Sequence, residues 1–171
     1  MRHKTQTIKV ATSPATSMSF PSLHPQVVEA VGDTCPIWTS KQHGRDVMEY
    51  CTHVSGHFRC GNQRCSHVWS SGLVAIRIRA FNRERYNATV YSQRCKACNR
   101  LGFLSLDEDS YVERVAYRLK KWAGVSVEVP RHEVKSTPPH MSSLCEGCRQ
   151  GCCREGGRDD LTRGLQRLSL R

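Results

Sequence analysis

Cysteine is the residue type in this 171-residue chain with the most chemistry to offer, and there are ten of them. Cys60 and Cys65 bound the stretch "CGNQRC", and Cys95 and Cys98 form a C-x2-C pair in "CKAC". Thiolates at such spacings are typical ligands of zinc, which four of them bind as a tetrahedron. We predict that these four cysteines share one structural zinc ion.

The segment between the two pairs supports this prediction. It alternates apolar and polar residues with the period of a half-buried strand around Val74, Ile76 and Ile78, and does so again after the turn "NRER". A β-hairpin would return the second cysteine pair to the side of the first. A thioredoxin-like C-x-x-C would need a helix directly after Cys98, whereas "NRLGFLSL" continues as loop or strand.

A second group of possible ligands lies in "HMSSLCEGCRQGCC" near the end of the chain. One imidazole and three thiolates make a complete ligand set for a second zinc ion. These are His140, Cys145, Cys148 and Cys153. Cys152 is an alternative third thiolate and His132 a competing fourth ligand, while an exposed linker position is the plain alternative for His140.

The role expected for the remaining cysteines depends on whether the cellular compartment is oxidising or reducing. The N-terminus has no long apolar run, and no later segment offers the roughly 18 consecutive apolar residues of a membrane span. We therefore expect a cytoplasmic or nuclear protein, in which cysteines bind metal more often than they cross-link, and a mitochondrial leader is disfavoured. Cys35 and Cys51 have no partner at ligand spacing and are expected to be small core residues. For the histidines near the first cluster we expect surface or core positions and no ligation; these are His43, His53, His57 and His67.

The rest of the chain predicts an α+β fold, in which a small antiparallel zinc-ribbon sheet carries one packed amphipathic helix and a C-terminal zinc hook. Helical periodicity runs from residue 107 to Gly124, behind a capping box of Ser110 and Glu113. A shorter helix is expected between Pro25 and Gly32, and residues 125–130 are expected to form one further strand. Residues 38–51 are ambiguous between loop and short helix.

Positive charge is concentrated in the middle of the chain. The formal net charge is +11, and residues 59–103 contain nine Lys or Arg residues and one acid, Glu84. Such an excess attracts nucleic acid, an acidic membrane surface or an acidic partner, and a solubilising surface is the plain alternative. Five arginines and two tyrosines are the candidate RNA contacts. They are Arg77, Arg79, Arg83, Arg85, Arg94, Tyr86 and Tyr91.

Taken together, "GHFRCGNQRC", "YSQRCKACNR" and "H…LCEGC..G.C" resemble the 3CxxC-type zinc-binding domain of receptor-transporting proteins, zygote-arrest proteins and soluble fungal proteins, the fungal members being the nearest in pattern. The resemblance spans residues 20–155, between a disordered arm (1–19) and a basic tail (156–171). It implies the eight ligands given above, a variable position at Cys152 and a core role for Trp69 beside the first site.

The resemblance and the charge lead to one functional hypothesis and one alternative. Zygote-arrest proteins bind RNA, which agrees with the basic middle of this chain and favours a non-catalytic zinc module that binds RNA. Receptor-transporting proteins carry a C-terminal membrane segment, whereas this chain ends in "DDLTRGLQRLSLR". The alternative is therefore a protein-binding adaptor or trafficking helper without a membrane anchor. A nucleobase deaminase would need H-x-E and then P-C-x-x-C, and Arg94 stands where that proline would be.

Overall fold

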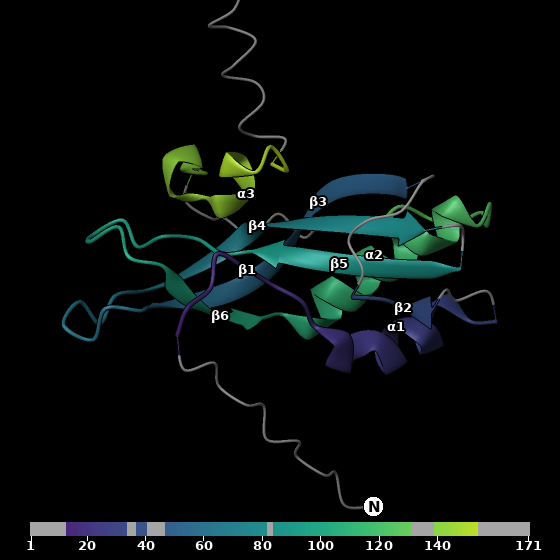
Figure 1. The fold of residues 1–171 in the computed structure, drawn as a ribbon, viewed down its shortest axis with the longest axis horizontal. Coiled ribbons are helices and arrows are strands. Elements are labelled where there is room, and N and C mark those ends of the chain that lie inside the picture. Colours follow the sequence, from purple (N-terminus) through teal and green to yellow (C-terminus); the bar gives the residue numbers. More distant parts are fainter. Residues whose placement is uncertain (1–12, 34–36, 41–46, 82–83, 131–138, 154–171) are drawn as a thin grey trace, which may run out of the picture.

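A six-stranded sheet forms the centre of the protein in the computed structural model, which describes residues 13–33, 37–40, 47–81, 84–130 and 139–153 (Figure 1). The strand order is β1-β5-β4-β3-β6, with antiparallel neighbours, and β2 pairs with β5 in parallel. The strands are β1 (Ser17–Met18), β2 (Ile37–Trp38), β3 (Val47–Cys60), β4 (Val68–Phe81), β5 (Arg85–Tyr91) and β6 (Gly102–Leu106). The predicted α+β class is confirmed.

The hairpin predicted between the cysteine pairs is formed by β4 and β5. Ile76 lies opposite Val90 and Ile78 opposite Ala88, and all four side chains are fully buried. The period-2 pattern was therefore a sufficient signal, because alternate residues of these strands face the same apolar layer.

Strand β3 was not expected over most of its length. It pairs with β4 from Val47 opposite Phe81 to Arg59 opposite Val68, with a register shift between Val54 and Gly56. Its first half mixes apolar and polar residues without a period of two, so sequence pattern gave no strand signal. Hydrogen bonding to β4 on one side and to β6 on the other makes it a strand.

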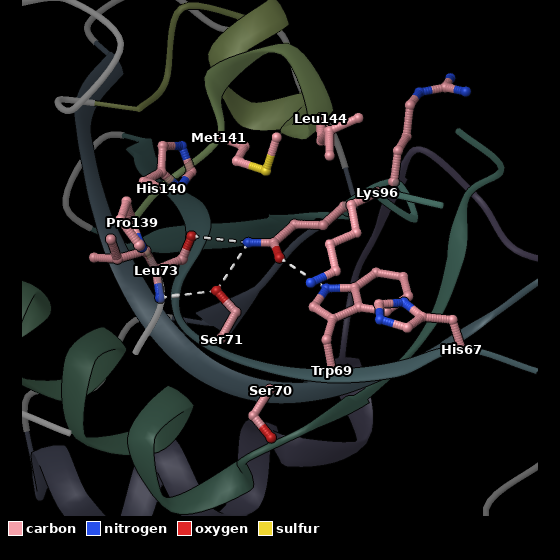
Figure 2. Close-up of a pocket in the computed structure, with 12 residues that line it drawn as sticks. His67, Trp69, Ser70, Ser71, Leu73, Lys96, Pro139, His140, Met141 and Leu144 are labelled. Carbon is pink, nitrogen blue, oxygen red and sulfur yellow. Dashed lines mark hydrogen bonds between the residues drawn. The ribbon is translucent and has the colours of Figure 1, made fainter. Parts of the chain in front are cut away.

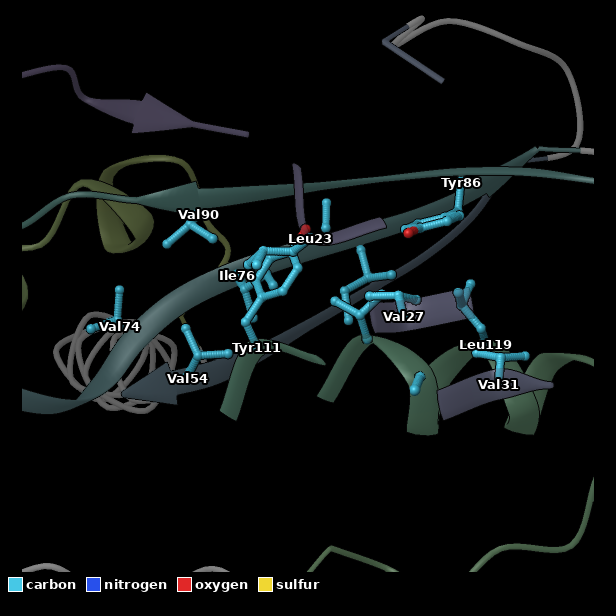
Figure 3. Packing of buried hydrophobic residues seen from close by; sticks show 14 of the residues in the cluster. Leu23, Val27, Val31, Val54, Val74, Ile76, Tyr86, Val90, Tyr111 and Leu119 are labelled. Atoms are coloured by element: carbon cyan, nitrogen blue, oxygen red, sulfur yellow. The ribbon is translucent and has the colours of Figure 1, made fainter. Parts of the chain in front are cut away.

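Two helices cover one face of the sheet, α1 (His24–Val31) and α2 (Glu108–Trp122), with the short helix η1 (Pro21–Leu23) leading into α1. Val27 of α1 and Tyr111, Val115 and Leu119 of α2 pack against Ile76 and its neighbours in the main core (Figure 3). Both helices were predicted. Burial of these one-turn repeats against the sheet contributes most of the helices' stability.

The start of α2 differs from the prediction. Asp107 is the N-cap, and its side chain accepts a hydrogen bond from the Ser110 N–H at 3.1 Å. The expected capping box of Ser110 and Glu113 is wrong, because Ser110 already lies inside the first turn. Its hydroxyl instead donates to the Asp107 carbonyl and accepts from the Ser55 N–H, each at 3.0 Å.

The zinc hook, which we define as residues 139–153, lies on the opposite face of the sheet from α1 and α2 (Figure 1). It contains η2 (Ser142–Leu144) and α3 (Glu146–Arg149), and packs on Ala75 of β4 and Tyr91 of β5. Ala75 and Ile76 are both fully buried although they face opposite sides of β4. The centre of the sheet is therefore covered on both faces.

Three further expectations concern the ends of the domain. Residues 125–130 form no strand, since no neighbouring strand pairs with them in the described part of the chain. Ser17 and Met18, within the expected arm, pair with Tyr91 and Val90 as β1. Residues 1–12 and 154–171, which hold most of the expected arm and the tail, lie outside the described residues.

Candidate metal centres

The first four predicted ligands meet at one end of the sheet. Cys60 ends β3, Cys65 lies in the turn before β4, and Cys95 and Cys98 lie in the turn between β5 and β6. Their sulfur atoms all lie within 4.8 Å of one another, with Cys60 Sγ 3.4 Å from Cys98 Sγ. A tetrahedron with Zn–S bonds of about 2.3 Å has edges of about 3.8 Å, so this group, the ribbon site, fits a zinc ion.

Two tight turns position the thiols of the ribbon site. In one, the Cys60 N–H donates to the His67 carbonyl at 2.8 Å, and in the other the Cys95 N–H donates to the Arg100 carbonyl at 2.8 Å. The turns approach closely at Gly61, where an added Cβ would lie 2.6 Å from the Leu101 carbonyl oxygen. Glycine is required there because any side chain would separate the two cysteine pairs.

Electrostatics of the ribbon site also favour a cation. Burial raises the pKa of Cys60 to about 12, so Cys60 is a thiol at neutral pH without a metal. The backbone N–H of Arg100 lowers the pKa of Cys98 to about 7. Zinc binds cysteines as thiolates. The positive charge of a bound zinc ion therefore takes the place of the protons that buried thiols keep when no metal is bound.

The second predicted group also comes together, and we call it the hook site. The ligand atoms of His140, Cys145, Cys148 and Cys153 lie within 4.8 Å of one another. His140 Nε2 is 3.2 Å from Cys148 Sγ and 3.4 Å from Cys153 Sγ. In a tetrahedral zinc site with one nitrogen and three sulfur ligands, the N–S distances are about 3.5 Å, which is close to these two distances. The competing ligand His132 lies outside the described residues.

Cys152 is not part of the hook site. It forms a disulfide with Cys51 of β3, with a Cα–Cα distance of 5.4 Å, although 101 residues separate the two in the chain. The expectation that Cys51 is a small core residue without a partner is wrong, because β3 passes beneath the hook and leaves Cys51 only partly buried. Cys35 lies outside the described residues.

The hook is held on the sheet mainly at its first turns. The Arg94 N–H donates to the Leu144 carbonyl at 2.7 Å and the Glu146 N–H to the Ser92 carbonyl at 3.1 Å. The Arg94 guanidinium also pairs with the buried Glu146 carboxylate. Gly147 allows this approach, since a Cβ there would lie 2.3 Å from the Cβ of Ala75.

Sequence reasoning missed one histidine at each site. His53 Nε2 lies 3.1 Å from Cys153 Sγ, and His67 Nδ1 lies 3.5 Å from Cys95 Sγ. A ring N–H donated to a ligand sulfur orients that sulfur and supports the metal from outside the ligand set. Only His67, two residues after Cys65, had a local signal, because His53 reaches Cys153 through the strand order.

Trp69 occupies the expected core position beside the ribbon site. Its ring makes stacked contacts with the rings of Phe58 and His67, with centroid distances of 5.1 and 5.4 Å. Its indole N–H donates to Gln93 Oε1 at 3.2 Å, and Gln93 Nε2 donates in turn to Ser71 Oγ at 2.9 Å (Figure 2). This network lines a cavity of about 130 Å³ between the sheet and the hook.

Most of the described residues that were predicted to contact RNA are buried or form ion pairs within the protein. Tyr86 is fully buried and Tyr91 is 6% exposed, so the expectation that they stack on bases is wrong. Both belong to strand β5, whose two faces are covered by the main core and by the hook. Arg77 and Arg79 pair with Glu49, at 3.4 and 2.7 Å.

Among the other predicted contacts, Arg94 pairs with Glu146, and Arg85 is exposed. Arg83 lies outside the described residues. The hairpin therefore offers no continuous row of free cations and aromatic rings in the described part of the chain.

Comparison with known proteins gives one match. The model of the 3CxxC zinc ribbon, a zinc-binding domain, matches residues 53–151, which include seven of the eight predicted ligands and end two residues before Cys153. No curated protein and no solved structure matches the chain. Within the described residues, no helix combines the length and the apolar character needed to cross a membrane. With two groups of four possible zinc ligands and a match over more than half its length, the chain belongs to the 3CxxC zinc-ribbon family of zinc-binding domains.

Proposed function

We propose that this protein is a non-catalytic zinc module of the cytoplasm or nucleus that binds RNA through the ribbon end. The ribbon end consists of the two turns that hold the ribbon site, residues 59–68 and 92–101. Its four exposed cations carry the proposal. They are Arg59, Arg64, Lys96 and Arg100.

The charge of the ribbon end is positive even after the metal site is counted. The two turns contain no Asp or Glu. Four thiolates and one zinc ion carry a charge of about −2, which the four exposed cations exceed by about +2. Arg59 is also oriented, because its guanidinium lies 4.9 Å from the centre of the Phe103 ring. Such a surface suits phosphate groups along a nucleic acid backbone.

The ligand sets support a structural role for the metal. Each group offers four protein ligands, so a zinc ion bound by all four has no open position for a substrate or an activated water. Catalytic zinc needs such a position. Zinc here would fix the two turns that present the cations, and the likeness to RNA-binding zygote-arrest proteins agrees with this use.

RNA binding is tested by filter binding of a fluorescent single-stranded RNA to the zinc-loaded full-length protein at increasing salt. Four phosphate contacts predict a slope of log K against log salt of about −2.8. The variant Arg64→Glu/Lys96→Glu should lower affinity at least about tenfold at low salt. The control Arg85→Glu/Lys121→Glu makes the same change in net charge at exposed positions away from the ribbon end.

Two outcomes would contradict the proposal. One is an equal loss of affinity in both double variants, which would mean that only net charge matters. The other is absence of binding at about 50 mM salt, where phosphate contacts are strongest. If the protein instead retains a cellular protein partner after nuclease treatment and binds no RNA, the adaptor alternative replaces the RNA hypothesis.

A further inference from the structure

Two cysteines outside both metal groups join the hook to the sheet. Cys51 lies on β3, and Cys152 directly precedes the hook ligand Cys153. The Cys152 side chain is 1% exposed and packs with Cys145 and Cys153, while Cys51 is only partly buried. The disulfide therefore joins a buried cysteine of the hook to a partly buried cysteine of the sheet.

The disulfide holds the part of the hook that the backbone contacts do not. In the turn after β5, the Arg94 N–H donates to the Leu144 carbonyl and the Ser92 carbonyl accepts from the Glu146 N–H, both at the start of the hook. After α3, the described contacts with the sheet include a hydrogen bond of 2.7 Å from Arg77 to the Gln150 carbonyl and the bond to Cys51. Arg77 is the cross-strand neighbour of Cys51, so both connections come from one place in the sheet.

We propose that Cys51 and Cys152 form a redox lock on the hook site. When the disulfide is closed, it fixes the residue next to Cys153 and keeps that sulfur at the metal. When the disulfide is reduced, the end of the hook is held by Arg77 and His53, and zinc leaves faster. Among the described residues, no disulfide joins the ribbon site to another part of the sheet, so its zinc should be insensitive to the state of this pair.

The closing reaction needs an oxidant, and hydrogen peroxide is the class we propose. The Cys51 sulfur attacks one peroxide oxygen, the O–O bond breaks, and Cys51 sulfenic acid and one water form. The Cys152 sulfur then attacks the Cys51 sulfur, the S–O bond breaks, and the second water leaves. Two thiols and one peroxide give one disulfide and two waters. A small thiol or a phosphine reverses the bond by reduction.

Cys51 is the suitable point of attack in this pair. It is the more exposed of the two cysteines, and an oxidant reaches a partly exposed cysteine more readily than a buried one. Ligand thiolates are comparatively protected while they hold zinc. The order of events is therefore metal binding first and oxidation of the remaining pair second.

The test measures zinc release from the full-length protein loaded with two zinc ions. One portion is treated with one equivalent of hydrogen peroxide and another with a phosphine reductant. Closure of the lock is checked as a mass loss of two hydrogens and as a Cys51–Cys152 cross-linked peptide. Zinc transfer to a chromogenic chelator should then show two phases, of which one is at least about tenfold faster in the reduced protein.

Variants separate the lock from the metal sites. Cys51→Ser and Cys152→Ser should both retain two zinc ions and release one of them at the fast rate, whether oxidised or reduced. Cys153→Ser should lose zinc from the hook site in either state. The proposal is overturned if the oxidised and reduced wild-type proteins release zinc at equal rates. It is also overturned if peroxide expels zinc and cross-links the ligands instead.

Discussion

Gly147 is the position where the smallest change should separate the two metal sites. It lies in α3, the helix that rests on β4, and an added Cβ would lie 2.3 Å from the Cβ of Ala75. Ala75 is fully buried in a strand that pairs on both sides, so the sheet cannot move away. Gly147→Ala should therefore displace the hook and leave the ribbon site intact.

The size of the effect follows from the contact. Ordinary carbon contacts start near 3.4 Å, so the hook must rise by about 1.1 Å. That shift stretches the hydrogen bond from Glu146 N–H to the Ser92 carbonyl, now 3.1 Å, beyond the useful range. Overpacking of this kind costs about 1–3 kcal/mol. If this whole cost destabilises the zinc-bound form of the hook, zinc affinity at the hook site drops roughly 5- to 150-fold.

The assay is a competition titration of each variant with chelators of graded affinity, which resolves the hook site from the ribbon site. The matched control is a double variant that removes one methyl group from the sheet and places one on the hook. Ala75→Gly/Gly147→Ala carries the same atoms but places the Cβ on the hook, so it should recover hook affinity to within about threefold. Ala75→Gly alone should cost about 1 kcal/mol of stability, because glycine is unfavourable within a strand.

Two results would refute this reasoning. Wild-type zinc affinity in Gly147→Ala would show that the hook does not need its close approach to β4. Failure of the double variant to recover would show that the loss has a cause other than the contact with Ala75.

Three further predictions concern single side chains. The Tyr111 hydroxyl is buried and has no hydrogen-bond partner among the described residues, so Tyr111→Phe should raise the free energy of unfolding by about 1 kcal/mol in urea titrations; a decrease would show that the hydroxyl is paired. His53→Ala should weaken zinc binding at the hook site about tenfold, whereas His57→Ala, an exposed change on the same strand, should leave it unchanged. The raised pKa of Cys60 keeps it protonated below about pH 12, so zinc binding at pH 7 should release protons and tighten as pH rises. Calorimetry in buffers of different ionisation enthalpy measures that release, and a heat independent of the buffer would contradict it.

Much of the ribbon site could be predicted because its signals are local. The two cysteine pairs have ligand spacing, and the alternation around Ile76 and Val90 identifies the hairpin that joins them. Helix α2 was equally clear from its one-turn repeats. The first residue of α2 was not, because both Asp107 and Ser110 can cap a helix, and only the contact of Ser110 with Ser55 on β3 distinguishes their roles.

The two tyrosines predicted to stack on RNA bases are buried for a related reason. Alternation shows which residues of a strand share a face, and it does not show what covers that face. Tyr86 of β5 is buried in the main core and Tyr91 beneath the hook. Glu49 of the unpredicted strand β3 pairs with both Arg77 and Arg79. The exposed cations of the ribbon end lie instead at its two turns.

By itself, the sequence determined the types and spacing of the ligands in each metal group, because those ligands come from short segments or from a hairpin with a clear period. Only the tertiary structure decided how the hook is attached. The pairing of Cys51 with Cys152, the support of Cys153 by His53 and the close approach of Gly147 to Ala75 all join the hook to β3 or β4. Contacts between residues so far apart in the chain depend on strand order and register, which no local pattern specifies.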